Sequence, residues 1–298
     1  MIIDPRSWLF IPGDSEKKLG KADGAGADAV IIDLEDAVAL SNKDIARDMT
    51  AAFLAERERD ARRTQLWVRV NAFDTGRTAE DIAAVISGAP DGIVLPKSEG
   101  VADLEVLSKI IDKAEKKAGL AVGSTRIMPV ATETARAVLK LNEFADAKLP
   151  RLQGLSWGAE DLGTAVGAIG NRLPDGRFYE AFLMVRSLTL FAAHAANAQA
   201  IDTLMADFRD EAALKASSEW SYREGFTGRL AIHPAQVEVI NAAYLPTEKQ
   251  VQDAEAIITA FEDVADGAGT VQLEGKMVDR PHLVQAERLL VRWKAFQS

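Results

Sequence analysis

Short apolar runs alternate along the chain with longer segments that have helical spacing. The runs are continuously apolar, which is typical of parallel strands buried on both faces. They are Trp8–Ile11, Ala29–Ile32, Leu66–Val70, Gly92–Leu95, Arg126–Val130, Gly154–Trp157, Ala200–Leu204 and Arg229–Ile232. The segments between them predict helices, among them Asp44–Arg59, Thr78–Ser87, Val101–Ala118, Thr134–Ala145 and Phe178–Ala196.

Eight such alternations predict the fold class, an α/β protein built on a closed (β/α)8 TIM barrel. A doubly wound parallel sheet is the alternative. That fold usually carries a glycine-rich fingerprint between its first strand and the following helix. Here Gly24 and Gly26 precede the second apolar run instead of following the first, so the barrel is favoured.

The pattern changes after Pro246. Thr247–Glu262 and Pro281–Phe296 have helical spacing, and the glycine-rich stretch Ala265–Gly275 separates them. So short a tail cannot build an independent core. We therefore predict two parts: a catalytic barrel over residues 1–245, and an arm or lid over residues 246–298. This arm would pack on its own barrel or complete the active site of a neighbouring subunit.

Composition narrows the class of protein. The 298 residues contain no cysteine, which excludes disulfides, thiolate metal sites and cysteine nucleophiles. The N-terminal segment lacks the basic start and long apolar run of a signal peptide. No segment approaches the roughly 18 apolar residues of a membrane span. We expect a cytoplasmic protein with no membrane partner, and the net charge of −10 argues against a nucleic-acid partner.

Polar side chains follow the apolar runs one after another. In a barrel of this kind the catalytic groups lie at the C-terminal ends of the strands. The polar residues at these positions are Asp33, Glu35, Asp36, Arg69, Asn71, Lys97, Thr132, Glu133, Glu160, Asp161, Asp202 and His233. Their repetition predicts a shared active-site mouth, with a set of independent helix caps as the alternative.

Individual residues carry competing interpretations. Asp36 and Asp161 each precede a predicted helix, so N-capping competes with a functional role. Arg69 lies inside an apolar run and needs a partner, since an unpaired buried charge is costly. Its planar guanidinium suits a substrate carboxylate, and a structural ion pair is the alternative. Glu133 follows a buried run and is a poor helix cap, which favours a functional role.

Hard oxygen ligands dominate the predicted mouth. Magnesium typically takes one or two carboxylates together with waters and substrate oxygens. Glu133 and Asp161, at the ends of adjacent strands, could converge on one such ion. The segment Gly154–Gly158 also fits the G-x-S-x-G pattern of serine hydrolases. That pattern requires the serine on a sharp turn, whereas Ser156 lies within an apolar run.

Eight sequence blocks resemble those of the citrate lyase beta-subunit-like family, which contains malyl-, citramalyl- and citryl-thioester lyases. The resemblance covers essentially the whole chain, and the order of the blocks is specific. The blocks are RSWLFIPGDSEKK, ADAVIIDLEDAV, RVNAFDT, VLPKSE, ATETARAV, LSWGAEDLGTAVGA, GRLAIHPAQV and LEGKMVDRPHLVQAERLL. The resemblance implies a TIM barrel and a magnesium cofactor.

The resemblance also implies roles for carboxylates and an arginine. Glu133 of the E-T motif and Asp161 of the A-E-D-L motif match the metal ligands of the family. Arg69 of the R-V-N motif matches the arginine that binds the ketoacid carboxylate. Glu35 and Asp36 of D-L-E-D match acidic residues near the waters of the metal, and we count them among the catalytic residues.

Other matched positions concern the thioester and the proton. Asp279 matches the acid/base aspartate of the C-terminal G-x-M-x-D segment, which often reaches in from a neighbouring subunit; lid packing is the alternative. Phe10 and Lys21 match positions near the adenine and a phosphate of coenzyme A. Pro96 and Lys97 of the V-L-P-K-S-E block are assigned to substrate binding.

Two departures from the family pattern bear on the substrate. Asp14 and Ser15 stand where the malyl-thioester lyases commonly place a basic residue that binds coenzyme A phosphates. Ala135–Ala137 lacks a glycine that is common after the E-T motif. Coenzyme A recognition is therefore only partly supported, and an acyl-carrier thioester or a free acid stays open.

The predicted activity is a magnesium-dependent carbon–carbon lyase that cleaves or forms a 3-hydroxyacyl thioester, such as citryl-, malyl- or citramalyl-coenzyme A. The products of cleavage would be a ketoacid and an acetyl thioester. One alternative is a malyl or citramalyl thioester hydrolase. Another is a beta-like subunit that works with an acyl-carrier protein. The resemblance favours a homo-oligomer, in particular a trimer.

Overall fold

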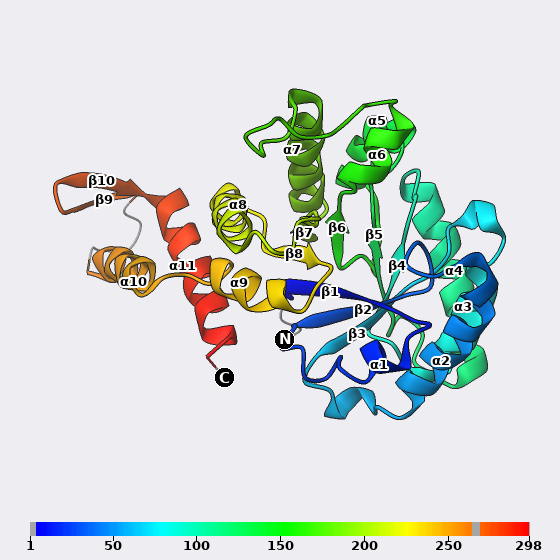
Figure 1. The fold of residues 1–298 in the computed structure, drawn as a ribbon. Helices are drawn as coiled ribbons and strands as arrows, with labels where there is room; N and C mark the ends of the chain where they lie inside the picture. Colours follow the sequence, from blue (N-terminus) through cyan, green and yellow to red (C-terminus); the bar gives the residue numbers. More distant parts are fainter. Residues whose placement is uncertain (1–3, 264–268, 298) are drawn as a thin grey trace. The chain divides into compact units, whose positions relative to one another are not determined.

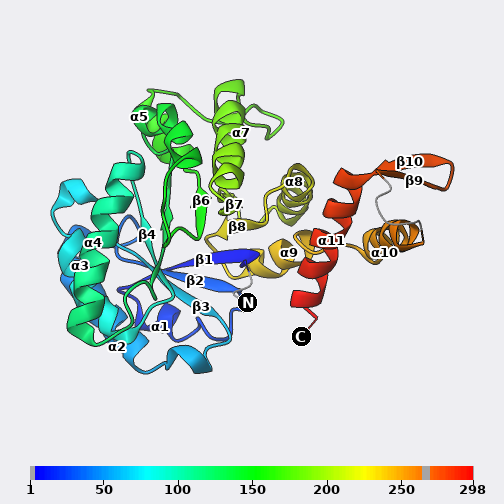
Figure 2. The ribbon, with the colours of Figure 1, turned by 180° about the vertical axis from the view of Figure 1, so that it is seen from behind.

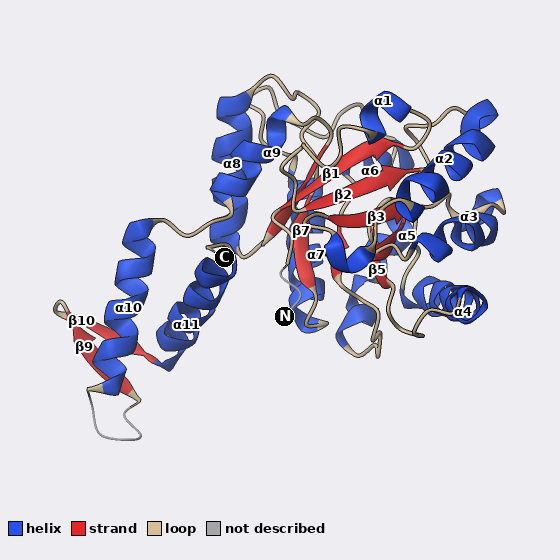
Figure 3. Ribbon diagram, turned by 90° about the horizontal axis from the view of Figure 1, so that it is seen from below, coloured by secondary structure: helices blue, strands red, loops and turns tan. Residues whose placement is uncertain are grey.

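The computed structural model describes residues 4–263 and 269–297. They form two compact units, Asp4–Asn241 and the residues from 242 onward. The first unit contains eight parallel strands with helices around them (Figures 1 and 3). The strands are β1 (Ser7–Pro12), β2 (Ala29–Asp33), β3 (Gln65–Arg69), β4 (Gly92–Leu95), β5 (Arg126–Pro129), β6 (Gly154–Ser156), β7 (Gln199–Asp202) and β8 (Gly228–Ala231).

The strands run around a barrel in the order β5-β4-β3-β2-β1-β8-β7-β6. The circle closes between β5 and β6 through two isolated parallel bridges, Ile127–Leu152 and Val130–Ser156. One backbone hydrogen bond of this seam runs from the N–H of Ala131 to the carbonyl of Ser156 at 2.8 Å. The predicted TIM barrel is confirmed, and all eight apolar runs coincide with its strands to within two residues.

Helical segments follow the strands and cover the barrel from outside (Figure 2). The α-helices of this unit are α1 (Glu16–Leu19), α2 (Lys43–Ala55), α3 (Thr78–Val85), α4 (Val101–Ala118), α5 (Ala135–Leu139), α6 (Ala159–Ala165), α7 (Glu180–Ala195), α8 (Glu211–Glu224) and α9 (Ala235–Ala243). The predicted helix Thr134–Ala145 is in fact α5 followed by a 3₁₀ segment, Leu141–Ala145. The predicted helix Asp44–Arg59 ends earlier, at Ala55.

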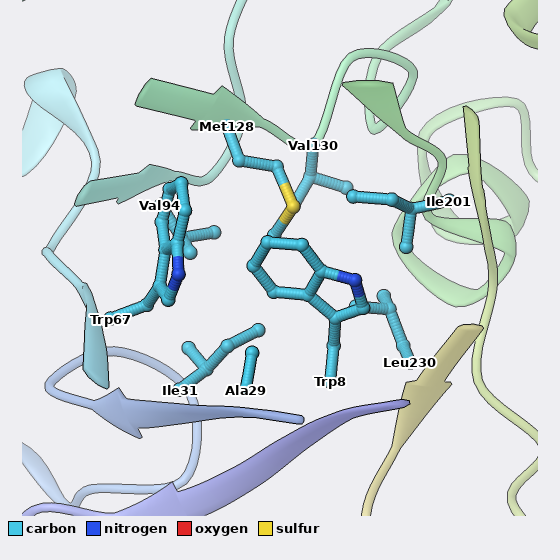
Figure 4. Packing of buried hydrophobic residues seen from close by; sticks show 9 residues of the cluster. All are labelled: Trp8, Ala29, Ile31, Trp67, Val94, Met128, Val130, Ile201 and Leu230. Atoms are coloured by element: carbon cyan, nitrogen blue, oxygen red, sulfur yellow. The ribbon is translucent and has the colours of Figure 1, made fainter. Parts of the chain in front are cut away.

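Apolar side chains that point inward fill the barrel (Figure 4). Trp8 and Trp67 meet edge to face, with ring centroids 5.0 Å apart. Gly92 leaves room for this packing, because a Cβ there would come within 2.1 Å of a Trp67 ring carbon. Since side chains of the same face recur every second residue, the positions two residues after Trp8 and Trp67 also face the interior, nearer the C-terminal ends of the strands.

The second unit holds two helices and a hairpin. Its elements are α10 (Glu248–Glu262), β9 (Thr270–Leu273), β10 (Lys276–Asp279) and α11 (Arg280–Ala295). Both predicted helices are confirmed to within one residue. The antiparallel hairpin was not predicted; it turns at Glu274 and Gly275, which both have positive φ, as a two-residue hairpin turn requires. Residues 265–268 of the glycine-rich stretch lie outside the described residues.

Within 4–263 and 269–297, no helix is both long and apolar enough to cross a membrane.

Candidate active site

A cavity of about 430 Å³ opens at the C-terminal ends of the barrel strands. Five predicted site residues line it: Phe10, Asp36, Arg69, Glu133 and Asp161. The rest of its wall contains Asp33, Lys18, Trp157, Gly158, Glu160, Thr203, Leu204 and Leu230, among others. Six of the twelve polar strand-end residues therefore share one cavity, whereas the other six do not line it: Glu35, Asn71, Lys97, Thr132, Asp202 and His233.

Asp33 holds Arg69 in a fixed orientation. The two residues are register partners at the ends of β2 and β3. The Nε and Nη2 groups of Arg69 each donate to an Asp33 oxygen at 2.7 Å. Burial alone would lower the pKa of Arg69, but its hydrogen bonds and charge interaction with Asp33 outweigh this effect and raise it. The same pair holds the pKa of Asp33 below its ordinary value, even though burial opposes this.

The guanidinium of Arg69 also touches other predicted site residues. Its Nη1 lies 3.0 Å from an oxygen of Glu35 and 3.7 Å from one of Asp36. Its central carbon lies 4.7 Å from the centroid of the Phe10 ring. The structural ion pair that was the alternative for Arg69 is thus present. It is compatible with ligand binding, since arginine has more N–H donors than Asp33 uses.

Lys97 connects the carboxylates of the mouth. Its ammonium forms an ion pair with Glu35 and lies 3.6 Å from both Asp36 and Asp161. Its backbone is left-handed, with φ of 50°, a conformation that costs a lysine about 1–2 kcal/mol. The strained backbone directs the N–H of Lys97 to an oxygen of Glu133. Burial raises the pKa of Glu35, and Arg69 and Lys97 only partly offset this.

Glu133 is almost completely buried, with 4% of its surface exposed. Burial raises its pKa to about 8, the negative charge of Asp161 adds to this effect, and the N–H of Lys97 opposes it. Gly158 makes room for the side chain, because a Cβ there would lie 2.7 Å from Cγ of Glu133. The repulsion between these two carboxylates is unfavourable unless a proton or a cation offsets it.

The donor set of the mouth fits magnesium. Glu133 and Asp161 offer hard carboxylate oxygens, and the buried Glu133 would lose its electrostatic penalty beside a cation. Among the described residues, no group of three or more His, Cys, Asp or Glu side chains is placed to hold a metal. Waters and substrate oxygens would have to complete the coordination shell, as magnesium prefers.

Three predicted residues lie elsewhere. Pro96 is buried behind Lys97 and does not line the cavity. Lys21 is exposed just beyond α1 and does not line it either; Lys18, one turn earlier, does. Asp279 belongs to the second unit, where it is the N-cap of α11 and contacts Nδ1 of His282.

Two alternatives from the sequence are wrong. Neither Asp36 nor Asp161 is an N-cap, because α2 is capped at Asn42 and α6 at Gly158. Asp161 lies in the first turn of α6 instead. The serine-hydrolase pattern also fails, since Ser156 is fully buried within β6 and its hydroxyl cannot reach a ligand.

Two of the predicted strand-end residues make contacts that the sequence reasoning did not identify. Asp33 received no role beyond its place at a strand end, although its position opposite Arg69 follows once β2 and β3 are aligned in register. Asp202, at the end of β7, accepts a hydrogen bond from Nε1 of Trp157 at 2.7 Å and so fixes one wall of the cavity. No local signal in the sequence links Trp157 to Asp202.

Gly158→Ala is expected to lower activity roughly 10- to 100-fold, since displacement of a catalytic group by about 1 Å costs about that much. The added methyl group would displace the side chain of Glu133, because its Cβ would lie 2.7 Å from Cγ of Glu133. Steady-state kinetics at saturating magnesium would measure the loss. Gly163→Ala in α6 is the matched control, because its Cβ would meet only Phe182 at 3.8 Å. Equal activity of the two variants would contradict the prediction.

Comparisons with known proteins identify the family of this chain. The HpcH/HpaI aldolase/citrate lyase family matches residues 6–234. Citrate lyase subunit beta from Leuconostoc mesenteroides subsp. cremoris is 36% identical over 286 residues, covering 96% of this chain and 92% of that one. (3S)-Malyl-CoA thioesterase from Cereibacter sphaeroides is 35% identical over 294 residues, covering 98% and 96%.

A solved structure is similar over the same length. The CitE protein from Mycobacterium tuberculosis, in complex with magnesium, acetoacetate and coenzyme A, superposes with a TM-score of 0.77. It is 32% identical and covers 98% of each chain. The barrel, the cavity and these relatives define an enzyme of the carbon–carbon lyase class. The chain belongs to the HpcH/HpaI aldolase/citrate lyase family, as its sequence blocks predicted.

Proposed function

We propose that this enzyme is a magnesium-dependent lyase that cleaves, or in reverse forms, the bond between C2 and C3 of a 3-hydroxyacyl-coenzyme A thioester. Cleavage would give a ketoacid and an acetyl thioester. The observation that carries the proposal is the presence, in one cavity, of two carboxylates, Glu133 and Asp161, together with the oriented guanidinium of Arg69. The magnesium, acetoacetate and coenzyme A bound by the CitE relative support it.

Glu133 and Asp161 would hold the magnesium ion. When bound, the ion supplies Lewis-acid chemistry that stabilises negative charge on the substrate's oxygens. Arg69 would bind the carboxylate of the ketoacid portion and orient it. Glu35 and Asp36 would keep Lys97 and Arg69 in place, and Phe10 would form an apolar wall for the ligand.

Asp279 would move the proton. As the C2–C3 bond breaks, the bonding electrons pass into the thioester as an enolate, and the hydroxyl proton of the substrate passes to water as the ketone forms. Protonated Asp279 would then donate its proton to C2 and be reprotonated by water, and in the reverse condensation its carboxylate would remove a proton from C2. To act this way Asp279 must give up its contact with His282, so the arm of residues 246–298 would serve as a lid.

The remaining assignments concern partners. Lys18 and Lys21 are suited to bind the phosphates of coenzyme A. If the substrate is an acyl-carrier thioester, these two lysines would contribute less to its binding. Pro96 would shape the floor beneath Lys97. We further propose a cytoplasmic homo-oligomer, with a trimer favoured, in which the arm completes a neighbouring subunit's site.

A product assay tests the proposal. Malyl-, citramalyl- and citryl-coenzyme A would be presented separately with magnesium, and the products identified by mass spectrometry. A ketoacid together with acetyl-coenzyme A from one of them is the expected result. If none of the three is cleaved at the carbon–carbon bond, with or without an acyl-carrier protein, the proposed activity is wrong.

Thioester hydrolysis is the second candidate, favoured by the similarity to the (3S)-malyl-CoA thioesterase. The same cavity would bind the same substrate, but water would attack the thioester carbonyl. The assay separates the two activities, since hydrolysis yields the hydroxy acid and coenzyme A without a ketoacid.

A further inference from the structure

A second, larger cavity of about 700 Å³ lies outside the barrel. Residues of α7 and α8 line it, together with the loop before α7 and the loop after β7. It shares one lining residue, Glu160, with the cavity at the barrel mouth. The proposed catalytic residues do not line it, so it needs an explanation of its own.

Most of the charged groups around this cavity already have partners. Arg186 binds Asp202 at 3.1 Å, and Arg177 binds Asp175 at 2.7 Å. The other acidic side chains are held by groups of the protein. Glu160 accepts a hydrogen bond from Asn171, Asp207 accepts one from the N–H of Arg209, and Asp210 caps α8.

Two arginines of this cavity form no direct ion pair. Within the described residues, neither Arg172 nor Arg229 has a carboxylate within 4.0 Å, the limit that defines the ion pairs above. Arg229 is 2% exposed, and its Nη1 is held only by the hydroxyls of Ser217 and Ser218, at 2.8 and 3.0 Å. Its buried Nε has no hydrogen-bond partner among the described residues.

Arg172 faces the same cavity from the loop before α7. Its Nη1 donates to the carbonyl of Gly176 at 2.7 Å, and its guanidinium lies over the Phe178 ring at 3.7 Å. Burial lowers the pKa of Arg172 and the positive charge of Arg229 lowers it further, while the negative charges of Glu160 and Asp202 offset this only in part. The two guanidiniums are therefore close enough to repel each other.

Arg229 is buried and Arg172 is partly buried, and an anion between them would supply the direct ion pair that both lack. Guanidinium groups bind carboxylate and phosphate with particular strength because their donors match both geometries. Phe178, Met205 and Trp220 give the same cavity an apolar wall. We infer that this cavity binds a small organic anion, its carboxylate or phosphate between Arg172 and Arg229 and its apolar body against Phe178 and Trp220.

Phenyl phosphate and benzoate are suitable probes, with benzyl alcohol as the neutral control. Isothermal titration would measure their binding to the full-length wild type and to Arg172→Gln. We expect at least one of the two anions to bind, and benzyl alcohol to bind far more weakly. The anion that binds more tightly would identify the preferred head group, carboxylate or phosphate. Loss of a charged hydrogen-bonding partner should weaken binding roughly tenfold or more.

Matched variants locate the binding. Arg177→Gln removes an arginine of the same loop whose charge Asp175 already neutralises. Because exposed ion pairs contribute little, the affinity of this variant for the anion should stay within about twofold of wild type. Trp220→Ala should weaken phenyl phosphate but not inorganic phosphate. Circular dichroism would verify the fold of each variant.

Several results would overturn the inference. These are no binding of either anion to the wild type, undiminished binding to Arg172→Gln, or equal losses in Arg172→Gln and Arg177→Gln. Loss of binding in Arg69→Gln but not in Arg172→Gln would assign the anion to the barrel mouth and would also reject it.

Discussion

Glu133→Gln is expected to lower lyase activity by about three orders of magnitude while leaving the folded protein at least as stable. A metal ion contributes several kcal/mol to transition-state stabilisation, and each 1.36 kcal/mol is worth about tenfold in rate. The amide keeps the shape of the side chain but removes the negative charge that would hold the ion. Activity with the coenzyme A thioester that the wild type cleaves, measured across magnesium concentrations, would show the loss.

Stability distinguishes this loss from misfolding. The pKa of Glu133 is raised from 4.5 to about 8 in the folded protein, so without metal the folded state binds this proton more tightly than the unfolded state does. Stability should therefore fall as pH rises from about 4.5 to about 8, and glutamine should remove that fall.

At pH 8 without magnesium, Glu133→Gln should melt no lower than wild type, and magnesium should stabilise only the wild type. Glu143→Gln, at an exposed glutamate, is the control and should keep both activity and the response to magnesium. Retention of magnesium-dependent activity by Glu133→Gln would contradict the assignment of this residue.

Arg151→Met is expected to destabilise the barrel by about 3–5 kcal/mol, the usual cost of removing one partner from a buried ion pair. Arg151 donates to both oxygens of the fully buried Glu115, at 3.0 and 2.6 Å. The backbone N–H groups of Gly123 and Thr125 complete the shell of this carboxylate. Guanidinium-chloride unfolding would measure the difference in free energy.

The same pair predicts a pH dependence. Burial opposes ionisation of Glu115, but Arg151 and the backbone donors outweigh it and lower its pKa from 4.5 to about 2. This contribution to stability is fully present above about pH 4.5 and is lost as pH falls toward 2. The advantage of wild type over Glu115→Gln should shrink across that interval. A constant difference between pH 7 and pH 2 would show that the charge of Glu115 does not act as described. Asp175→Asn, in an exposed ion pair, should change little at any pH.

The strands and the location of the mouth could be predicted because both depend on local patterns. A strand buried on both faces must be apolar along its whole length, and the polar residue that follows it marks the strand end. The long helix α4 (Val101–Ala118) was predicted residue for residue for the same reason. Its apolar positions repeat with helical spacing, and a glycine ends it.

The connections between side chains could not be predicted, because they depend on the register of strands far apart in the sequence. Arg69 clearly needed a partner, but the choice of Asp33 requires the alignment of β2 with β3. The contact of Lys97 with Glu133 uses a backbone N–H in a left-handed conformation, which a lysine rarely adopts. The hairpin of the second unit was missed because glycine was interpreted as a break and not as the turn between two short strands.

The seam between β5 and β6 gives the proposed cation a further consequence. The barrel is held there by two isolated bridges, and Glu133 and Asp161 follow the two strands on either side of it. An ion held by both side chains would cross-link β5 and β6 at the most weakly connected part of the barrel. Local opening of the barrel would then be coupled to loss of the ion. Amide hydrogens along the β5–β6 seam should therefore exchange more slowly when magnesium is present. Depletion of magnesium would therefore remove both the activity and this link between β5 and β6.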